Sequence, residues 1–577
     1  MIACIFHKTS NLGVEIVFSN SQFETISKIQ TTNNHGTKYS LGGYTCISNS
    51  NLSIKSNPSQ YILELYQKKG IEALDLLRFE FSFGIVNQKE NFFFGARDAM
   101  GIKPFYYYNS DNIFIYSTDI KWLKQYLKQT ELSKDWILSS LTGSVYDKTT
   151  SPIKDIKKLA PAHYLILENG KISISRYWEL TKQALPILSE QDYILELKTL
   201  LVKAVESRIN GRIGAELSGG LDSSAIVGII AQNNPKIITY THTLADALHG
   251  KILPYKDERY YRDLVLNQYQ QLEFRNIDAQ DKGLFYELQD ELKRQLMPVN
   301  NTLAYLSDSV YDIAMHDRVN TLFSGFGGDE GISNFANIIP HQYAKQFRLR
   351  ALKQALGKNY FSKEWTRQLL ISQFPFLRPK RQSWREQSYG MQFLNTDFTE
   401  QIKAKTTYFS YHNSKKPSTL DEYLSIKLNE NYISNRIEAT GASARTRGIE
   451  YTFPLLDIDL ISYYYNLPDA IKYKNGMGRY AYREAIKTFV PKEIYLRTDK
   501  TGATVPSVLA RFKKDYTLIE DFLQSVKTGP ASAYIDFDKM LINMKLIKQY
   551  TEGVKVRANQ HIFFNALMLI LYLEEEY

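Results

Sequence analysis

The chain has 577 residues, of which 44% are hydrophobic and 23% are charged. This length exceeds what one hydrophobic core supports and the composition is that of a folded protein, which excludes both a disordered chain and a single small domain. The net charge of +10 permits an acidic partner such as a nucleotide, a peptide or a nucleic acid, without choosing among them.

The cysteines and the apolar segments indicate the compartment. Two cysteines, Cys4 and Cys46, are too few for a disulfide framework or a thiolate zinc site, and no histidine pair has metal-ligand spacing on a helix face. The first residues lack the basic and apolar regions of a signal peptide, and the apolar run from Ile562 to Leu573 is too short to span a bilayer. We therefore expect a cytoplasmic protein without a membrane partner, in which 562–573 forms a buried helix.

The texture of the sequence changes once along the chain. Residues 1 to about 180 alternate short β-rich runs with turn residues, as in Asn91–Arg97 and Asn112–Ser117. From about 190 onward, helical periodicity is interrupted by short apolar strands such as 213–217 and 236–243. We predict a strand-rich α+β domain over residues 1–185 and an α/β domain with a parallel sheet over residues 186–577.

A glycine- and hydroxyl-rich turn lies between the predicted strand 213–217 and a predicted helix that begins near Ser224. Free backbone N–H groups and the helix dipole favour an anion at such a position. The glycines let the backbone approach phosphate oxygens, the hydroxyls donate to them, and a carboxylate can hold Mg²⁺ against them. The predicted pyrophosphate-binding residues of this loop are Ser218, Gly219, Gly220, Asp222, Ser223 and Ser224. No lysine follows the glycines, so the loop is not a Walker loop.

A second glycine-rich segment, 320–330, again follows a predicted strand. Gly325, Gly327 and Gly328 are predicted to contact the nucleotide, and Asp329 follows them directly. Asp222 and Asp329 could together bind Mg²⁺ on a triphosphate, because magnesium prefers a few carboxylates plus phosphate oxygens. The sequence therefore predicts ATP and Mg²⁺ as cofactors.

Several motifs resemble a known family. The first loop resembles that of the ATP pyrophosphatases, and the segments 96–106, 116–122 and 176–178 resemble the N-terminal domain of asparagine synthetases. The resemblance covers essentially the whole chain and implies a glutaminase-like, Ntn-type sandwich followed by a pyrophosphatase-type synthetase domain. In that family the glutaminase nucleophile is an N-terminal cysteine whose own amine can serve as base. Ile2 stands at that position here, and Cys4 is expected to be a buried structural residue, so we expect no glutamine hydrolysis.

Phe326, in the second loop, departs from most of these relatives. Asparagine synthetases carry Glu at this point and β-lactam synthetases carry Tyr, each suited to a small amino-acid-like substrate. A bulky aromatic residue before Gly-Gly-Asp-Glu resembles the lasso peptide cyclases, which adenylate an Asp or Glu side chain of a precursor peptide and join it to the N-terminal amine. This resemblance implies a precursor peptide as substrate, with a leader-binding protein and a leader protease as partners, and no nucleic acid.

Two later segments resemble the family with differences. Residues 448–457 resemble its Glu-x-Arg-x-Pro-Phe-Leu-Asp segment, but Thr452 stands where the Arg normally is. Glu450 is retained, and it could polarise the incoming amine or belong to a structural ion pair. Residues 479–502 match the closing segment of the family, in which a lysine reaches the phosphates, and Lys500 is the residue that the resemblance assigns to the transition state.

A basic stretch with interleaved aromatic residues covers 342–385 and contains one acidic residue, Glu364. Such a stretch could bind a peptide or RNA, or could be a solvated helix face.

These features together predict an ATP-dependent, AMP-forming amide ligase that adenylates a side-chain carboxylate and closes a lasso peptide. The first alternative is an asparagine synthetase or another small-molecule amide synthetase that uses free ammonia, against which Phe326, Thr452 and Ile2 count. The second alternative is a non-catalytic scaffold that binds peptide or nucleotide. The retained Asp222 and Asp329 count against a scaffold, because unused buried charges are costly.

Overall fold

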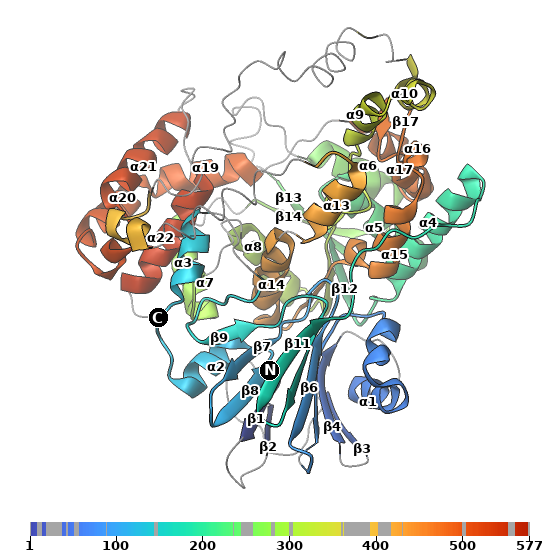
Figure 1. Ribbon diagram of the computed structural model, residues 1–577. Helices are drawn as coiled ribbons and strands as arrows, with labels where there is room; N and C mark the ends of the chain where they lie inside the picture. The colour runs from blue at the N-terminus through green and yellow to red at the C-terminus, as the bar shows by residue number, and fades with distance from the viewer. Residues whose placement is uncertain are drawn as a thin grey trace.

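The structure is a computed structural model (Figure 1). It describes residues 2–7, 14–18, 37–41, 44–50, 57–87, 89–142, 148–234, 236–243, 258–278, 283–298, 304–358, 362, 393–401, 417–429, 431–498, 504–551 and 560–574.

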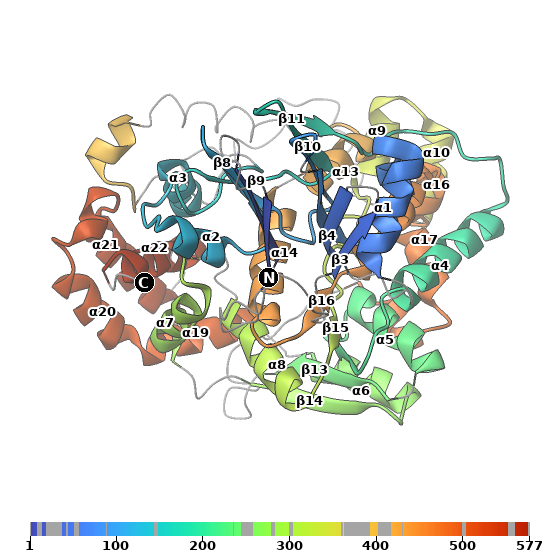
Figure 2. The same ribbon diagram turned by 90° about the horizontal axis from the view of Figure 1, so that it is seen from below.

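Two antiparallel sheets form the front half, with strand orders β2-β1-β8-β7-β9 and β11-β10-β6-β5-β4-β3. Seen from below, β8 and β9 lie on one side of this half and β3 and β4 on the other (Figure 2). The strands are β1 Ile2–His7, β2 Val14–Phe18, β3 Thr37–Leu41, β4 Tyr44–Ser50, β5 Phe81–Asn87, β6 Phe92–Arg97, β7 Tyr106–Asn109, β8 Ile113–Ser117, β9 Ile156–Lys158, β10 His163–Glu168 and β11 Lys171–Arg176. The predicted strands at 91–97 and 112–117 are therefore confirmed as β6 and β8.

Apolar side chains fill the space between the two sheets and cover their outer faces. Cys4, Phe93, Phe114 and Leu165 belong to the cluster of buried residues between the sheets. The outer face of the six-stranded sheet packs on α1 (Pro58–Lys69) and η1 (Gly70–Leu76). The other sheet packs on α2 (Ile120–Leu127) and α3 (Lys134–Thr142), which share a core with the helices at the end of the chain.

A five-stranded parallel sheet forms the centre of the second half, in the order β14-β13-β12-β15-β16. Its strands are β12 Ile213–Glu216, β13 Ile238–His242, β14 Glu273–Ile277, β15 Thr321–Phe323 and β16 Glu450–Thr452. From β12 the chain proceeds outward to β13 and β14, and then returns to place β15 on the other side of β12. The order of the strands therefore reverses between β12 and β15, and ligands of open α/β sheets bind at the carboxyl ends of such a pair.

Helices surround this sheet, in keeping with the predicted α/β domain (Figure 1). Those before β16 are α4 Glu190–Glu206, α5 Leu221–Asn233, α6 Arg259–Gln268, α7 Leu284–Gln295, α8 Ala304–His316, α9 Ile338–Lys345, α10 Leu349–Leu356, α13 Leu420–Asn429 and α14 Asn431–Arg445. Those after it are η5 Pro454–Leu456, α15 Ile458–Asn466, α16 Asp469–Lys472, α17 Tyr480–Ile486, α18 Lys492–Tyr495, α19 Thr504–Lys514, α20 Tyr516–Ser525, η6 Pro530–Ala533, α21 Phe537–Thr551 and α22 Gln560–Glu574, with a short hairpin of β17 Tyr473–Lys474 and β18 Met477–Gly478 after α16. The predicted buried helix at 562–573 is confirmed as α22, which packs on α3. In the part of the chain that the structure describes, no helix has the length and apolarity needed to cross a bilayer.

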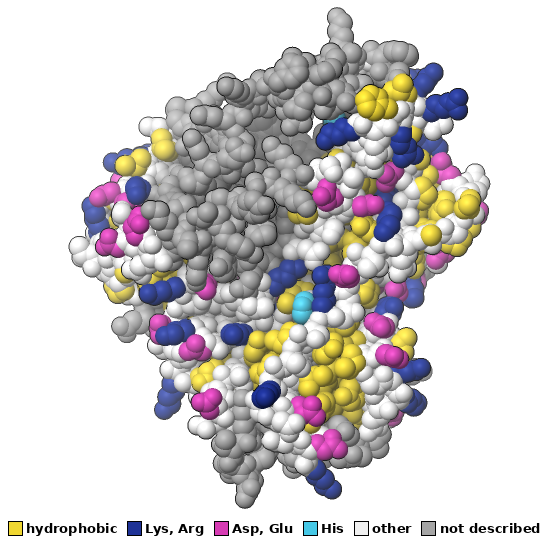
Figure 3. Space-filling view, in the orientation of Figure 1, with side chains coloured by type: hydrophobic (Ala, Val, Ile, Leu, Met, Phe, Trp, Pro, Cys, Tyr) yellow, Lys and Arg dark blue, Asp and Glu magenta, His cyan; other side chains and the backbone are white. Residues whose placement is uncertain are grey.

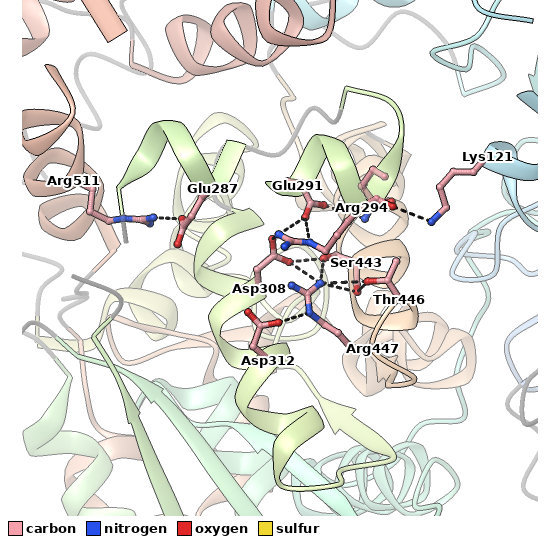
Figure 4. A network of polar contacts seen from close by, with 11 residues as sticks. Lys121, Glu287, Glu291, Arg294, Asp308, Asp312, Ser443, Thr446, Arg447 and Arg511 are labelled. Carbon is pink, nitrogen blue, oxygen red and sulfur yellow. Dashed lines mark hydrogen bonds and ion pairs between the residues drawn. The ribbon is translucent and has the colours of Figure 1, made fainter. Parts of the chain in front are cut away.

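A buried polar network joins α7, α8 and α14 (Figure 4). Arg294 donates to Glu291 at 3.1 Å and to Asp308 at 2.9 Å, and Arg447 binds Asp308 at 3.4 Å. Burial, and then the negative charge of Asp308, raises the pKa of Glu291. Lys121 of α2 donates to the carbonyl of Arg294, so α7 connects the front half with the helices of the second half.

Candidate active site

The first glycine-rich loop connects β12 to α5 at the point where the strand order reverses. Gly219 has a left-handed φ of +67°, and a Cβ there would lie 2.4 Å from the Cβ of Tyr261. Ser218 Oγ lies 3.0 Å from Ser223 Oγ, and Gly220 is the N-cap of α5 without a side-chain capping bond. Gly220 therefore leaves the first N–H groups of α5 without a side-chain cap, and the predicted binding of an anion there stays a prediction.

The second loop follows β15 and packs on the first through its glycines. A Cβ at Gly325 would lie 2.8 Å from the backbone nitrogen of Ser223, and a Cβ at Gly328 would lie 2.5 Å from Cγ of Asp222. Gly327 has a φ of +97° and packs on Leu456. Glycine is required here because the backbones of the two loops come too close for any side chain.

Asp222 and Asp329 form a carboxylate pair between the loops. Burial, and then the charge of Asp329, raises the pKa of Asp222, while Arg479 and the hydroxyls of Ser333 and Tyr482 oppose that rise. Asp222 Oδ1 is buried, and no described residue hydrogen-bonds to it. Two like charges this close, with an unsatisfied oxygen, fit a cation between them.

The donor set fits magnesium better than a transition metal. Among the described residues, no third His, Cys, Asp or Glu completes a metal cluster at this or any other position. Mg²⁺ on a nucleotide needs only one or two carboxylates, since phosphate oxygens and water supply the other ligands. Asp222 and Asp329 would hold the ion, which would neutralise charge on the phosphates. Arg479 forms an ion pair with Asp329 and places a positive charge at the same point.

An aromatic wall lies beside the second loop. Phe326 is half-buried, and its ring makes an edge contact with Phe453 at a centroid distance of 6.0 Å. The guanidinium of Arg436, from α14, lies 4.3 Å from the centre of the Phe326 ring. Tyr451 extends the wall, 4.8 Å from Phe453. Behind the wall, Ser324 Oγ donates to Glu216 Oε2 at 2.9 Å, and burial raises the pKa of Glu216 against the opposing effects of Tyr451, Ser324 and Arg436.

Comparisons with known proteins identify the family of both halves of the chain. The asparagine synthase family profile matches residues 196–553, and the glutamine amidotransferase domain profile matches residues 47–178. The chain belongs to the asparagine synthase family.

The relatives within this family are distant. A protein of Methanocaldococcus jannaschii named putative asparagine synthetase (glutamine-hydrolyzing) 2 is 30% identical over 284 residues, which are 47% of this chain and 52% of that protein. Asparagine synthetase (glutamine-hydrolyzing) 3 of Bacillus subtilis is 22% identical over 459 residues, which are 77% of this chain and 70% of that protein. The match to a solved structure, a glutamine phosphoribosylpyrophosphate amidotransferase from B. subtilis, covers 41% of this chain and 58% of that one, at 13% identity. Its TM-score of 0.21 is too low to support an argument.

In the front half of this asparagine synthase family member, Cys4 is a buried residue of a strand. Cys4 lies in the middle of β1, opposite Ile16 of β2 and Tyr116 of β8, and its exposed fraction is 0%. Burial raises the pKa of its thiol to about 12. The predicted buried structural cysteine is confirmed. Such a thiol is neither ionised near neutral pH nor accessible to a substrate.

Glu450 forms an ion pair with Lys103 of the front half, and the exposed fractions of the two side chains are 15% and 2%. In the register of the sheet, Glu450 pairs with Thr321 at the start of β15, whereas Thr452 pairs with Phe323 at its end. The two glycine-rich loops follow the carboxyl ends of β12 and β15, whereas Glu450 lies at the opposite end of the sheet, at the start of β16. Of the two roles left open by the sequence, this placement favours the structural ion pair. Thr452 Oγ1 is buried without a hydrogen-bond partner among the described residues.

Two other sequence predictions concern residues that lie wholly or partly outside the described part of the chain. Lys500 lies outside the described residues, so its catalytic role stays a prediction. The basic stretch is described over 342–358 and at Ser362. In that part Tyr343 is buried and packs under Arg348, while Phe347 is 76% exposed. The binding role of the stretch also stays a prediction.

Sequence reasoning assigned no role to three residues at the site. Arg479 and Tyr482 belong to the segment recognised by resemblance, and their spacing of three would have placed them on one face of a helix. Arg436 lies in no motif, because its contact with Phe326 joins residues that are 110 positions apart in the sequence. Only the packing of α14 reveals it.

Proposed function

We propose that this chain is an ATP-dependent, AMP-forming amide ligase that does not take its nitrogen from glutamine. The observation that carries the proposal is an intact pair of nucleotide loops beside a front half in which Cys4 is fully buried. In the proposed reaction a carboxylate oxygen attacks the α-phosphorus of ATP, and pyrophosphate leaves. An amine then attacks the acyl-adenylate, AMP leaves with the bonding electrons, and the amine gives up a proton.

The residues of the two loops would have distinct roles in these steps. The open N–H groups of α5 and the hydroxyls of Ser218 and Ser223 would bind the departing pyrophosphate. Asp222 and Asp329 would hold Mg²⁺, and Arg479 would balance the charge of this acidic pair. Lys500 would stabilise the charge that develops on the α-phosphate and on the tetrahedral adduct.

We further propose that the acceptor is a side-chain carboxylate of a precursor peptide and that the amine is its N-terminal amine, as in lasso peptide ring closure. The half-buried Phe326 supports this choice, because its ring offers apolar contact to a peptide where the small-molecule synthetases of this family carry Glu or Tyr. A leader-binding protein and a leader protease would be the partners of such an enzyme.

A second candidate is an asparagine synthetase that uses free ammonia; the names of the relatives support asparagine as the product, although those relatives are named as glutamine-hydrolyzing. Pyrophosphate release from Mg²⁺-ATP separates the two. We expect release with a precursor peptide encoded beside the gene, together with a peptide product lighter by one water. Release with aspartate and ammonium alone would establish the second candidate, and release with neither would favour a non-catalytic scaffold. Asp222→Asn serves as the inactive control in both reactions.

A further inference from the structure

A cavity of about 300 Å³ lies between the front half and the helices α13 and α14, outside the nucleotide loops. Its apolar lining includes Met100, Pro161, Trp178, Leu180, Leu428 and Ile433. Its polar lining includes three side chains that can carry a positive charge, namely Lys148, His163 and Arg176. On the face of the molecule seen in Figure 3, basic side chains gather around a histidine just above the apolar surface of the strand-rich half.

The positive groups of the cavity converge on one neutral oxygen. Lys148 Nζ lies 3.4 Å from Asn429 Oδ1, and Arg176 Nη2 lies 3.5 Å from the same atom. Both distances are at the outer limit of hydrogen bonding. A neutral amide oxygen does not balance two cations, and a carboxylate in the cavity could accept from both of them at shorter distances.

No acidic side chain lines the cavity among the described residues. Arg176 has an ion pair with Glu179 at 3.3 Å, but the Glu179 side chain is 62% exposed, so solvent screens that attraction. Burial, followed by the charges of Arg176 and Arg97, lowers the pKa of Lys148 to about 8. The same surroundings lower the pKa of His163. The cavity therefore combines a partly desolvated Lys148 with an Arg176 side chain that is 39% exposed, and no carboxylate lines it among the described residues, which favours an anion.

The helix α14 connects this cavity to the aromatic wall. Ile433 and Ser434 line the cavity, and Arg436 of the same helix lies over Phe326. Three residues of a helix rise about 4.5 Å along its axis. The cavity and the contact at Phe326 are therefore about one helical turn apart along α14.

We propose that this cavity binds a second carboxylate of the peptide acceptor, carried on a short apolar segment, and so orients the peptide without taking part in the chemistry. Trp178 and the aliphatic side chains would contact the apolar part, and Lys148 and Arg176 would bind the carboxylate. The peptide nature of the ligand rests on the proposed function; the anion site itself does not.

Calorimetry on the full chain tests the site directly. The probes are N-acetyl-leucine, its uncharged amide and inorganic phosphate. We expect the acid to bind at least about tenfold more tightly than the amide, because a carboxylate accepts charge-assisted hydrogen bonds from Lys148 and Arg176 and a neutral amide accepts only weaker ones. The double variant Lys148→Gln/Arg176→Gln should lose this preference. Lys171→Gln, at the other end of β11 and outside the cavity, is the matched control and should keep it.

The outcomes separate this inference from the proposed function. Equal binding of acid and amide, no binding of either, or tighter binding of phosphate than of the acid would overturn the carboxylate site. A precursor peptide turned over by the double variant with unchanged KM would also overturn it, while the proposed function would stand. Preferential binding of the acid by a protein that releases no pyrophosphate with any peptide would support the site and refute the proposed function.

Discussion

Gly328→Ala tests whether the two nucleotide loops act as one magnesium site. A Cβ at Gly328 would lie 2.5 Å from Cγ of Asp222 and 2.6 Å from each of its carboxylate oxygens. Ordinary contact begins at 3.4 Å, so the carboxylate must retreat by about 0.9 Å. The Asp222 side chain is short and its pocket is closed by Tyr482 and Ser333, so this retreat moves both oxygens away from the position of the ion.

A displacement of about 1 Å in a catalytic group can cost roughly 10²-fold, or about 2.7 kcal/mol. We expect Gly328→Ala to weaken Mg²⁺-ATP binding by about that factor, measured by titration calorimetry. The control is Gly331→Ala in the same loop, where the nearest atom to the new Cβ, the carbonyl oxygen of Gly327, lies at 3.2 Å. This contact is only 0.2 Å inside the ordinary limit of 3.4 Å and does not involve Asp222, so the variant should stay within about twofold of the wild type.

Removal of magnesium provides the second arm of the test. In EDTA the binding of ATP should be weak in the wild type and no weaker in Gly328→Ala, because the displaced carboxylate then has no ion to hold. The thermal unfolding temperatures of both variants show whether the fold is retained. If Gly328→Ala binds Mg²⁺-ATP like the wild type, or if Gly331→Ala is damaged as severely, the assignment of Asp222 to the metal is wrong.

Four further predictions follow from other parts of the molecule. Asp222→Asn should weaken Mg²⁺-ATP binding and turnover together. Lys500→Ala should retain binding and lose roughly 10²-fold in single-turnover rate, as for a lost transition-state donor. Full turnover by Lys500→Ala would show that this residue has no part in the mechanism. Cys4 should resist alkylation by iodoacetamide in the folded protein at pH 8, because burial raises the pKa of its thiol to about 12, and rapid alkylation seen by mass spectrometry would contradict a buried thiol. The protein should also release no glutamate from glutamine. The pKa of Glu291 is raised in the folded state, so the stability that this group contributes is present at low pH and is lost as the pH rises. The unfolding temperature of Glu291→Gln should therefore decrease less between pH 5 and pH 8 than that of the wild type. An equal decrease in both proteins would show that other groups cause it. Binding of N-acetyl-leucine should weaken above pH 8 and should be accompanied there by proton uptake, because Lys148 must be charged to bind the acid and its pKa is about 8 beside Arg176, Arg97 and His163. Calorimetry in buffers of different ionisation enthalpy measures this uptake. Its absence would exclude Lys148 as a ligand of the carboxylate.

The local parts of the nucleotide site could be predicted from the sequence. The strand, the glycine turn and the start of α5 are contiguous, so their order along the chain determines which N–H groups are open. The pairing of β12 with both β13 and β15 brings the two loops together, and an α/β pattern with a parallel sheet already implies such a meeting at the strand ends. Cys4 could be placed as buried because its immediate neighbours in the strand are apolar.

Contacts between distant segments could not be predicted in the same way. Glu450 looks the same in the sequence whether it faces the nucleotide or Lys103, and only the register of β16 against β15 separates these possibilities. Arg436 over Phe326 depends on how α14 packs on the sheet, and the basic cavity depends on the approach of β11 to α13. In each case the deciding partner is more than 100 residues away in the sequence, where local patterns carry no information about contact.

The packing of α14 also explains how the front half, in which Cys4 is buried, is held to the second half. Glu438 of this helix accepts hydrogen bonds from Arg97 at 2.6 Å and from Lys158 at 3.0 Å, and both donors belong to the front half. Burial opposes the ionised form of Glu438, but the charges of Lys158 and Arg97 hold the pKa of this carboxyl below its usual value. Breaking a buried ion pair of this kind typically costs about 3–5 kcal/mol, because the remaining charge loses its partner. The front half therefore fixes the helix that carries Arg436 to the aromatic wall, and this mechanical role needs no glutaminase chemistry.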